Sequence, residues 1–171
     1  MLLDIIIILV LLSIVWQDFK SYVLYWFIPP VLIVLFFLRS WQMTGLNQGI
    51  QYIGINLLFV VLQVSIVYMY YILKNRKLIP MIDKYIGWGD ILFLVCLSFA
   101  FSPLNFIFFY IISLIIILII YGSWYMFNGS LRKIPLAGMQ ALLLLISIIS
   151  GNLLHFSFYN DKALSYFISH L

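Results

Sequence analysis

Acidic residues are scarce in this chain, and two of them stand where they could do chemistry. The 171 residues include five aspartates and no glutamate. Asp18 closes the first apolar segment, and Asp90 opens a later one within Gly87-Trp88-Gly89-Asp90. Two carboxyl groups held close together cannot both ionise, so they share one proton. The ionised member can then deprotonate a water molecule while the protonated member polarises a peptide carbonyl, which is acid/base proteolysis without a metal or a covalent intermediate.

Two glycines precede the second aspartate. Gly87 and Gly89 have no Cβ, so a substrate strand could approach their backbone closely. We expect the next helix to begin at or near Asp90, where the helix dipole favours a charged carboxylate. Each residue also has an ordinary interpretation, because Gly-x-Gly-Asp before an apolar run is typical of a loop with an N-cap aspartate. Asp18 could likewise pair with Lys20 or mark the membrane boundary.

The elements that must position these residues are apolar helices. The chain is 66% hydrophobic and only 8% charged, with a mean hydropathy of +1.19. So few charges cannot cover the surface of a soluble domain. In lipid the backbone must satisfy its own hydrogen bonds, which leaves helices or closed barrels, and the apolar runs are too long for barrel strands. We therefore predict an all-α polytopic membrane protein that forms a single domain over residues 1–171.

Six segments are expected to cross the bilayer. They are residues 2–16, 23–38, 50–73, 91–101, 104–127 and 134–154. The short fourth segment is expected to gain a turn from residues 86–90. Pro29-Pro30 predicts a kink or break in the second segment. Asn56 and Gln63 lie on one face of the third segment and predict hydrogen bonds between helices.

The basic residues predict the orientation of these segments. Seven of the nine fall on one side of a six-span arrangement, and they are Lys20, Lys74, Arg76, Lys77, Lys84, Arg132 and Lys133. An excess of positive charge marks the cytoplasmic side. We therefore expect a protein of the inner (cytoplasmic) membrane with both termini extracytoplasmic. Asp18 and Asp90 then share the cytoplasmic face at similar depth and could meet inside the helix bundle.

These features resemble the type IV prepilin peptidases and the related preflagellin peptidases, which are membrane aspartyl proteases of the Gly-x-Gly-Asp class. Asp18 and Asp90 match the two aspartates of the family pattern. The segment Ile134-Pro135-Leu136-Ala137-Gly138 matches an Ile-Pro-containing segment at the start of the last span. The resemblance covers essentially the whole chain, including span count, loop order and the location of all three motifs.

The resemblance implies an endopeptidase that cleaves the leader peptide of prepilin-like proteins at the cytoplasmic membrane face. Asp18 and Asp90 would be the catalytic pair, Gly87 and Gly89 would shape the site, and Pro135 would help to place the last helix beside it. The partners would be prepilin-like membrane proteins and the lipid bilayer, without nucleic acid. No cofactor or metal is expected, and a zinc site has little support in a chain with one cysteine and no glutamate.

The chain departs from the family pattern at two places. Leu24-Tyr25-Trp26 stands where the family commonly has Ile-Pro-Asn, and Leu92 stands where it often has lysine. The single cysteine leaves no paired Cys-x-x-Cys insert of the kind that bifunctional members carry, so the chain resembles a peptidase-only form. Two alternatives stay open: a non-enzymatic six-helix membrane protein, such as a transporter's solute-binding subunit, and a degenerate peptidase homologue. A peptidase needs the two carboxylates to face each other, whereas a binding subunit does not.

Overall fold

The computed structural model describes residues 2–22, 24–75, 87–128, 134–153 and 158–161, and within them it is helical without strands. Three helices, α1 (Leu2–Ser21), α3 (Leu46–Asn75) and α5 (Pro103–Asn128), are long and apolar enough to cross a membrane. The other three are shorter and apolar: α2 (Ile28–Thr44), α4 (Trp88–Leu97) and α6 (Leu136–Leu153). The predicted all-α membrane architecture is confirmed for this part of the chain.

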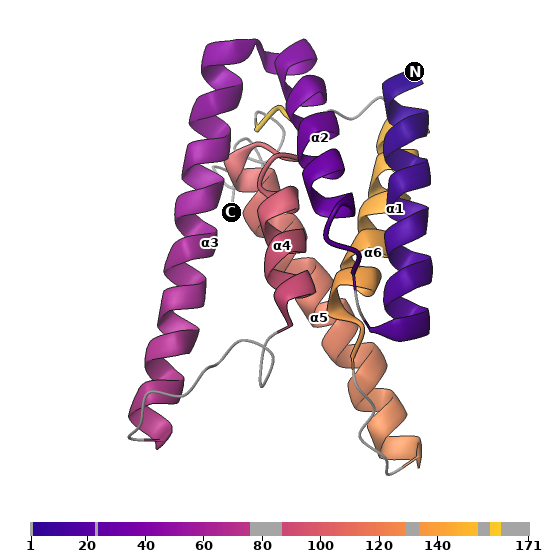
Figure 1. The fold of residues 1–171 in the computed structure, drawn as a ribbon, viewed down its shortest axis with the longest axis vertical. Coiled ribbons are helices and arrows are strands. Elements are labelled where there is room, and N and C mark those ends of the chain that lie inside the picture. Colours follow the sequence, from indigo (N-terminus) through magenta and orange to yellow (C-terminus); the bar gives the residue numbers. More distant parts are fainter. Residues whose placement is uncertain (1, 23, 76–86, 129–133, 154–157, 162–171) are drawn as a thin grey trace, which may run out of the picture.

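The helices form a bundle around the short helix α4 (Figure 1). α4 packs against α2, α3 and α6, and the most extensive contact in the bundle joins α1 to α6. α1 runs downward and α6 runs upward in Figure 1, so the end of α1 and the start of α6 lie at the same end of the molecule, as does the start of α4. α3 and α5 extend further and diverge at this end. The architecture thus gathers the helix ends that carry Asp18 and Asp90.

α1 is longer than the sequence suggested. It continues to Ser21 instead of ending near residue 16, so Asp18 lies inside the helix. Lys20 occupies the last turn, where a positive charge interacts favourably with the helix dipole. The buried face of α1 repeats with helical spacing, and its members are Ile7, Leu11, Ile14 and Asp18. Asp18 therefore continues an apolar stripe that faces the bundle.

The predicted kink or break at Pro29-Pro30 is wrong. α2 begins at Ile28 instead of residue 23, so both prolines lie in its first turn. Proline fits there because the first N–H groups of a helix have no intrahelical acceptor. α2 ends at Thr44, followed by Gly45 with φ +81°, a backbone conformation that favours glycine.

α4 begins two residues before Asp90, close to the predicted start, and ends at Leu97 instead of residue 101. An inward-facing Asp90 requires that the residues four and seven positions later also pack on other helices. Leu94 and Leu97 are both buried, so this prediction is confirmed. A short turn over residues 98–100 leads from α4 to α5.

The predicted hydrogen bonds of α3 to its neighbours are also confirmed. The Asn56 amide donates to the carbonyl oxygens of Ser98 (3.0 Å) and Phe101 (2.9 Å), and all three groups lie in the interior. Two turns further along the same face of α3, the Gln63 amide contacts the Tyr110 hydroxyl. These contacts join α3 to the turn after α4 and to α5.

Replacing Asn56 should test how much this contact stabilises the bundle. We expect Asn56→Leu to lower the free energy of unfolding by roughly 1–3 kcal/mol, because two buried carbonyl groups lose their donor. Ser65→Ala is a matched control, since the exposed Ser65 hydroxyl bonds only within α3, to the Val61 carbonyl. Thermal unfolding in detergent micelles would measure both variants, and equal unfolding midpoints would contradict the prediction.

Polar contacts also occupy the end of the bundle opposite Asp18. An ion pair joins Arg39 Nη2, near the end of α2, to Asp4 Oδ1 at the start of α1 (3.0 Å). The Ser102 N–H donates to the Phe158 carbonyl (3.0 Å), and the Ser102 hydroxyl donates to Asp161 Oδ1 (2.5 Å). These hydrogen bonds therefore join residues 158–161 to the start of α5.

Candidate active site

Asp18 projects from α1 onto the first turn of α6. Its side chain is buried, with only 5% of the residue exposed. Its Oδ2 atom accepts a hydrogen bond from the Gly138 N–H at 2.5 Å. Asp18 follows Ile7, Leu11 and Ile14 on the buried face of α1, and α1 makes its most extensive contact with α6. Asp18 thus joins the buried face of α1 to the start of α6.

Asp90 reaches the same helix from α4. Its Oδ1 atom accepts a hydrogen bond from the Ala137 N–H at 3.1 Å. The backbone of Gly87, the N-cap of α4, also hydrogen-bonds the Asp90 carboxyl. This is the back-contact from the third helical residue to the N-cap that a capping box contains. Asp90 therefore joins the start of α4 to the start of α6.

The two carboxyl groups meet at the N-terminus of α6. Ala137 and Gly138 are consecutive residues, and Asp18 and Asp90 lie close enough for two negative charges to repel each other. The first N–H groups of a helix lack intrahelical acceptors and form its positive end, so they bind carboxylates well. Each carboxyl uses one oxygen for this contact, Oδ2 of Asp18 and Oδ1 of Asp90. The predicted meeting of these two residues inside the bundle is what the structure shows.

The two predicted site glycines lie beside this cluster with different neighbours. Gly87 is exposed, and a Cβ built on it would stand 3.2 Å from Asp90 Oδ2. A Cβ on Gly89 would stand 3.1 Å from the Leu24 side chain. Gly89 thus lets α4 pack closely on the segment between α1 and α2. The side of Gly89 on which a Cβ would stand is covered by Leu24. A role for either glycine in receiving a substrate stays a prediction.

Pro135 lies two residues before the first N–H donor, Ala137, and Gly138 is the second donor. Pro135 is buried and immediately precedes α6, and its carbonyl accepts the Met139 N–H at 3.0 Å. Gly138 was not selected from the sequence as a site residue, although it belongs to the Ile-Pro-Leu-Ala-Gly segment. A Cβ on Gly138 would lie 2.9 Å from Asp18 Cβ, closer than packed atoms approach. The available signal was a glycine near the start of an apolar helix, where glycine is less favourable than alanine.

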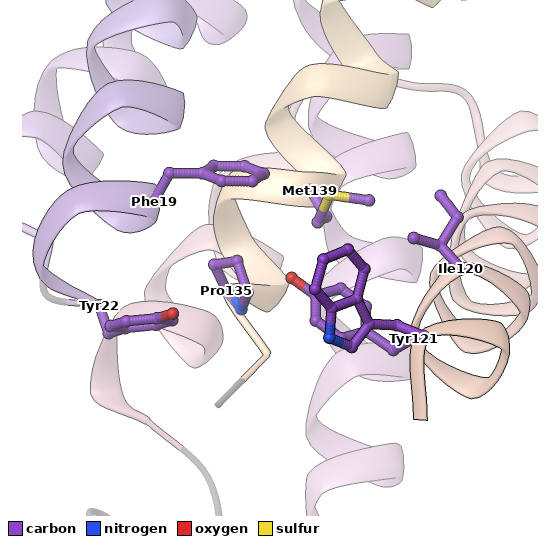
Figure 2. Close-up of a pocket in the computed structure, with 7 residues that line it drawn as sticks. Phe19, Tyr22, Ile120, Tyr121, Pro135 and Met139 are labelled. Atoms are coloured by element: carbon purple, nitrogen blue, oxygen red, sulfur yellow. The ribbon is translucent and has the colours of Figure 1, made fainter. Parts of the chain in front are cut away.

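An aromatic groove lies next to the carboxyl pair, on the side of α6 that faces α5 (Figure 2). Its volume is about 330 Å³. Figure 2 shows Pro135 and Met139 between Phe19 and Tyr22 on one side and Ile120 and Tyr121 on the other. Among the described residues its lining is Phe19, Tyr22, Ile120, Tyr121, Trp124, Pro135 and Met139. None of the described lining residues is charged, and the groove adjoins Asp18 through its neighbour Phe19.

The chemistry available here is that of two carboxyl groups and water. Within the described residues, no group of three or more His, Cys, Asp or Glu side chains could hold a metal ion. Comparison of the chain with protein-family models, curated proteins and solved structures finds no match.

Proposed function

We propose that this chain is a membrane aspartyl endopeptidase of the prepilin peptidase type, which cleaves the leader peptide of prepilin-like proteins at the cytoplasmic membrane face. One observation carries the proposal: Asp18 and Asp90 come from different helices, yet their carboxyl groups bind consecutive N–H groups of α6. Acids are rare in this chain, and burying a carboxyl group in a membrane bundle is costly. Two of them at one point favour a chemical role.

The geometry supports a shared-proton mechanism. One carboxylate accepts a proton from water while the protonated partner donates a hydrogen bond to the scissile carbonyl oxygen. The water oxygen then bonds to the carbonyl carbon, the C–N bond breaks, and the leaving amine takes up a proton from the acid member. In this mechanism the Asp18 oxygen that does not bind α6, Oδ1, meets water or substrate, whereas Asp90 Oδ2 lies beside Gly87. The uncharged aromatic groove offers space for an apolar residue next to the scissile bond.

The same contacts favour a second candidate, in which the aspartates only cap α6. A carboxylate that accepts N–H bonds at a helix start stabilises that helix whether or not it does chemistry. The chain would then be a degenerate peptidase homologue. The two candidates differ in one requirement, because a cap needs only an acceptor oxygen whereas a peptidase needs a group that takes up and releases a proton.

The peptidase proposal is tested by reconstituting the full chain in liposomes with a prepilin-like protein that bears its leader. Shortening of the substrate by the length of its leader is the expected result, and it should depend on both aspartates. The substrate panel should include every prepilin-like protein encoded by the same cell. If the folded protein shortens none of them, the capping role is the better account of Asp18 and Asp90.

The proposal also places the carboxyl pair at the cytoplasmic face, with both termini outside. Lys74→Cys, near the end of α3, should react with an impermeant maleimide only when the reagent reaches the cytoplasmic side, because basic residues mark that side. Gln42→Cys, exposed near the other end of the bundle, should react from outside. The native Cys96 is buried, so it should contribute little background. Labelling of Lys74→Cys by the impermeant reagent in intact cells would show that the orientation is the reverse of the predicted one.

A further inference from the structure

The first turn of α6 takes part in the site through its backbone alone. Its Ala137 N–H binds Asp90 Oδ1 and its Gly138 N–H binds Asp18 Oδ2. We propose that this turn is a backbone clamp that sets the separation of the two carboxyl groups, and that Gly138 is a positioning residue of the site. The catalytic consequence of the clamp rests on the proposed function, whereas the clamp itself can be tested without any cleavage.

Close approach of α1 explains why the clamp requires glycine at this position. A Cβ on Gly138 would stand 2.9 Å from Asp18 Cβ, 3.0 Å from Asp18 Oδ2 and 3.2 Å from the Phe19 ring. A carboxyl group or a ring can rotate away from such a contact. Asp18 Cβ cannot, because it is fixed to the backbone of α1. An added methyl group would therefore force α1 and α6 apart where the Gly138 N–H meets the carboxyl.

The clamp also explains how two acids stay together in an apolar bundle. Like charges repel, and no ion pair involves Asp18 or Asp90 among the described residues. The positive end of α6 offsets this repulsion, because successive N–H groups at a helix start favour negative charge. Each N–H fixes one oxygen of one carboxyl group. The same helical turn therefore also sets the orientation of both carboxyl groups. Loss of the Gly138 N–H contact should release the Asp18 carboxyl, and loss of the Ala137 N–H contact should leave Asp90 with its Gly87 contact alone.

Two substitutions separate the two halves of the clamp. Gly138→Ala should displace Asp18, whereas Ala137→Pro replaces the N–H that binds Asp90 Oδ1 with a ring carbon and should displace Asp90. Proline is tolerated in a first helical turn, and α2 already carries Pro29 at the second helical position that Ala137 occupies in α6. Gly122→Ala is the matched control, because a Cβ on this helical glycine of α5 meets no atom within 4 Å.

The clamp can be read by labelling the full-length protein in liposomes with a hydrophobic carbodiimide, which reacts with protonated carboxyl groups, followed by mass spectrometry. A carboxylate that loses an N–H donor takes up a proton more readily. Gly138→Ala should raise labelling of Asp18 relative to Asp90 roughly tenfold, and Ala137→Pro should shift the ratio the other way. Gly122→Ala should match the unmutated protein at both positions.

Cleavage of a prepilin-like substrate supplies the second readout. Gly138→Ala should lower kcat roughly tenfold or more, because the carboxyl pair is displaced from the scissile bond. Unchanged Asp18 labelling in folded Gly138→Ala, or unchanged Asp90 labelling in Ala137→Pro if the alanine variant does not fold, would overturn the clamp. Altered labelling with unaltered kcat would overturn its catalytic consequence. Altered labelling of a protein that cleaves no substrate would support the clamp and contradict the proposed peptidase activity.

Discussion

Asp18→Asn and Asp90→Asn should each abolish cleavage of a prepilin-like substrate while leaving the protein folded and inserted. Asparagine keeps the shape and one acceptor oxygen, so the Gly138 or Ala137 N–H retains its partner. The amide can neither accept the proton of water nor act as an acid, and positioned acid/base groups contribute about 10²–10⁴-fold to a rate. We therefore expect rates at least ~10²-fold lower in either variant. The reconstituted cleavage assay measures this directly.

The double variant adds a stricter requirement. Removing both aspartates should slow cleavage little more than removing one, because residues that act as a unit have non-additive effects. Asp83→Asn is the control acid and should be nearly silent; Asp83 lies outside the described residues and outside the Gly-x-Gly-Asp motif. Cleavage that persists in either single asparagine variant would refute the paired mechanism.

Alanine at the same positions distinguishes chemistry from capping. Asp18→Ala and Asp90→Ala remove the acceptor as well as the proton, so α6 loses a cap and the protein should be destabilised by about 0.5–2 kcal/mol. The asparagine variants should unfold at the temperature of the unmutated protein. Inactive but stable asparagine variants together with less stable alanine variants would show that the carboxylates serve both roles.

Asp4→Asn should destabilise the protein strongly through the opposite end of the bundle. The Arg39 side chain is only 8% exposed and is paired with Asp4 at 3.0 Å. Removing one partner of a buried pair leaves an uncompensated charge and costs roughly 3–5 kcal/mol. Tyr159 lies near this pair, and burial raises the pKa of its hydroxyl, so it stays neutral and cannot replace the lost negative charge. Thermal unfolding in detergent micelles would report the loss.

A second substitution should restore most of this stability. Arg39→Met in the Asp4→Asn background removes the orphaned charge, and apolar replacement of a whole buried pair is often neutral. The double-mutant cycle should therefore show strong coupling between the two positions. Because the pair lies at the other end of α1 from Asp18, the folded fraction of each variant should cleave normally. An Asp4→Asn protein as stable as the unmutated one would contradict this role for the pair.

Much of the secondary structure follows from the sequence alone. A chain this apolar must satisfy its backbone within helices, and six apolar segments predict the six helices at the correct places. The polar residues of α3 were also assigned correctly, since an apolar helix has few groups with which Asn56 can pair other than those of neighbouring helices. Helix ends were less accurate: Pro29-Pro30 starts α2 instead of breaking it, because the same proline that disrupts a helix interior fits a first turn.

For the candidate site, the sequence by itself determined which residue types are available and that Asp18 and Asp90 end and begin apolar helices on one side. It did not determine what holds them together, because helical periodicity shows which face of α1 is buried but not which helix covers it. Only the tertiary structure decided that α6 is that helix and that its Ala137 and Gly138 N–H groups bind the carboxyls. Backbone N–H groups are present at every residue except proline and carry no sequence signal. Their importance here arises from the packing of α1 and α4 on the start of α6, and a glycine at position 138 permits the close approach of α1.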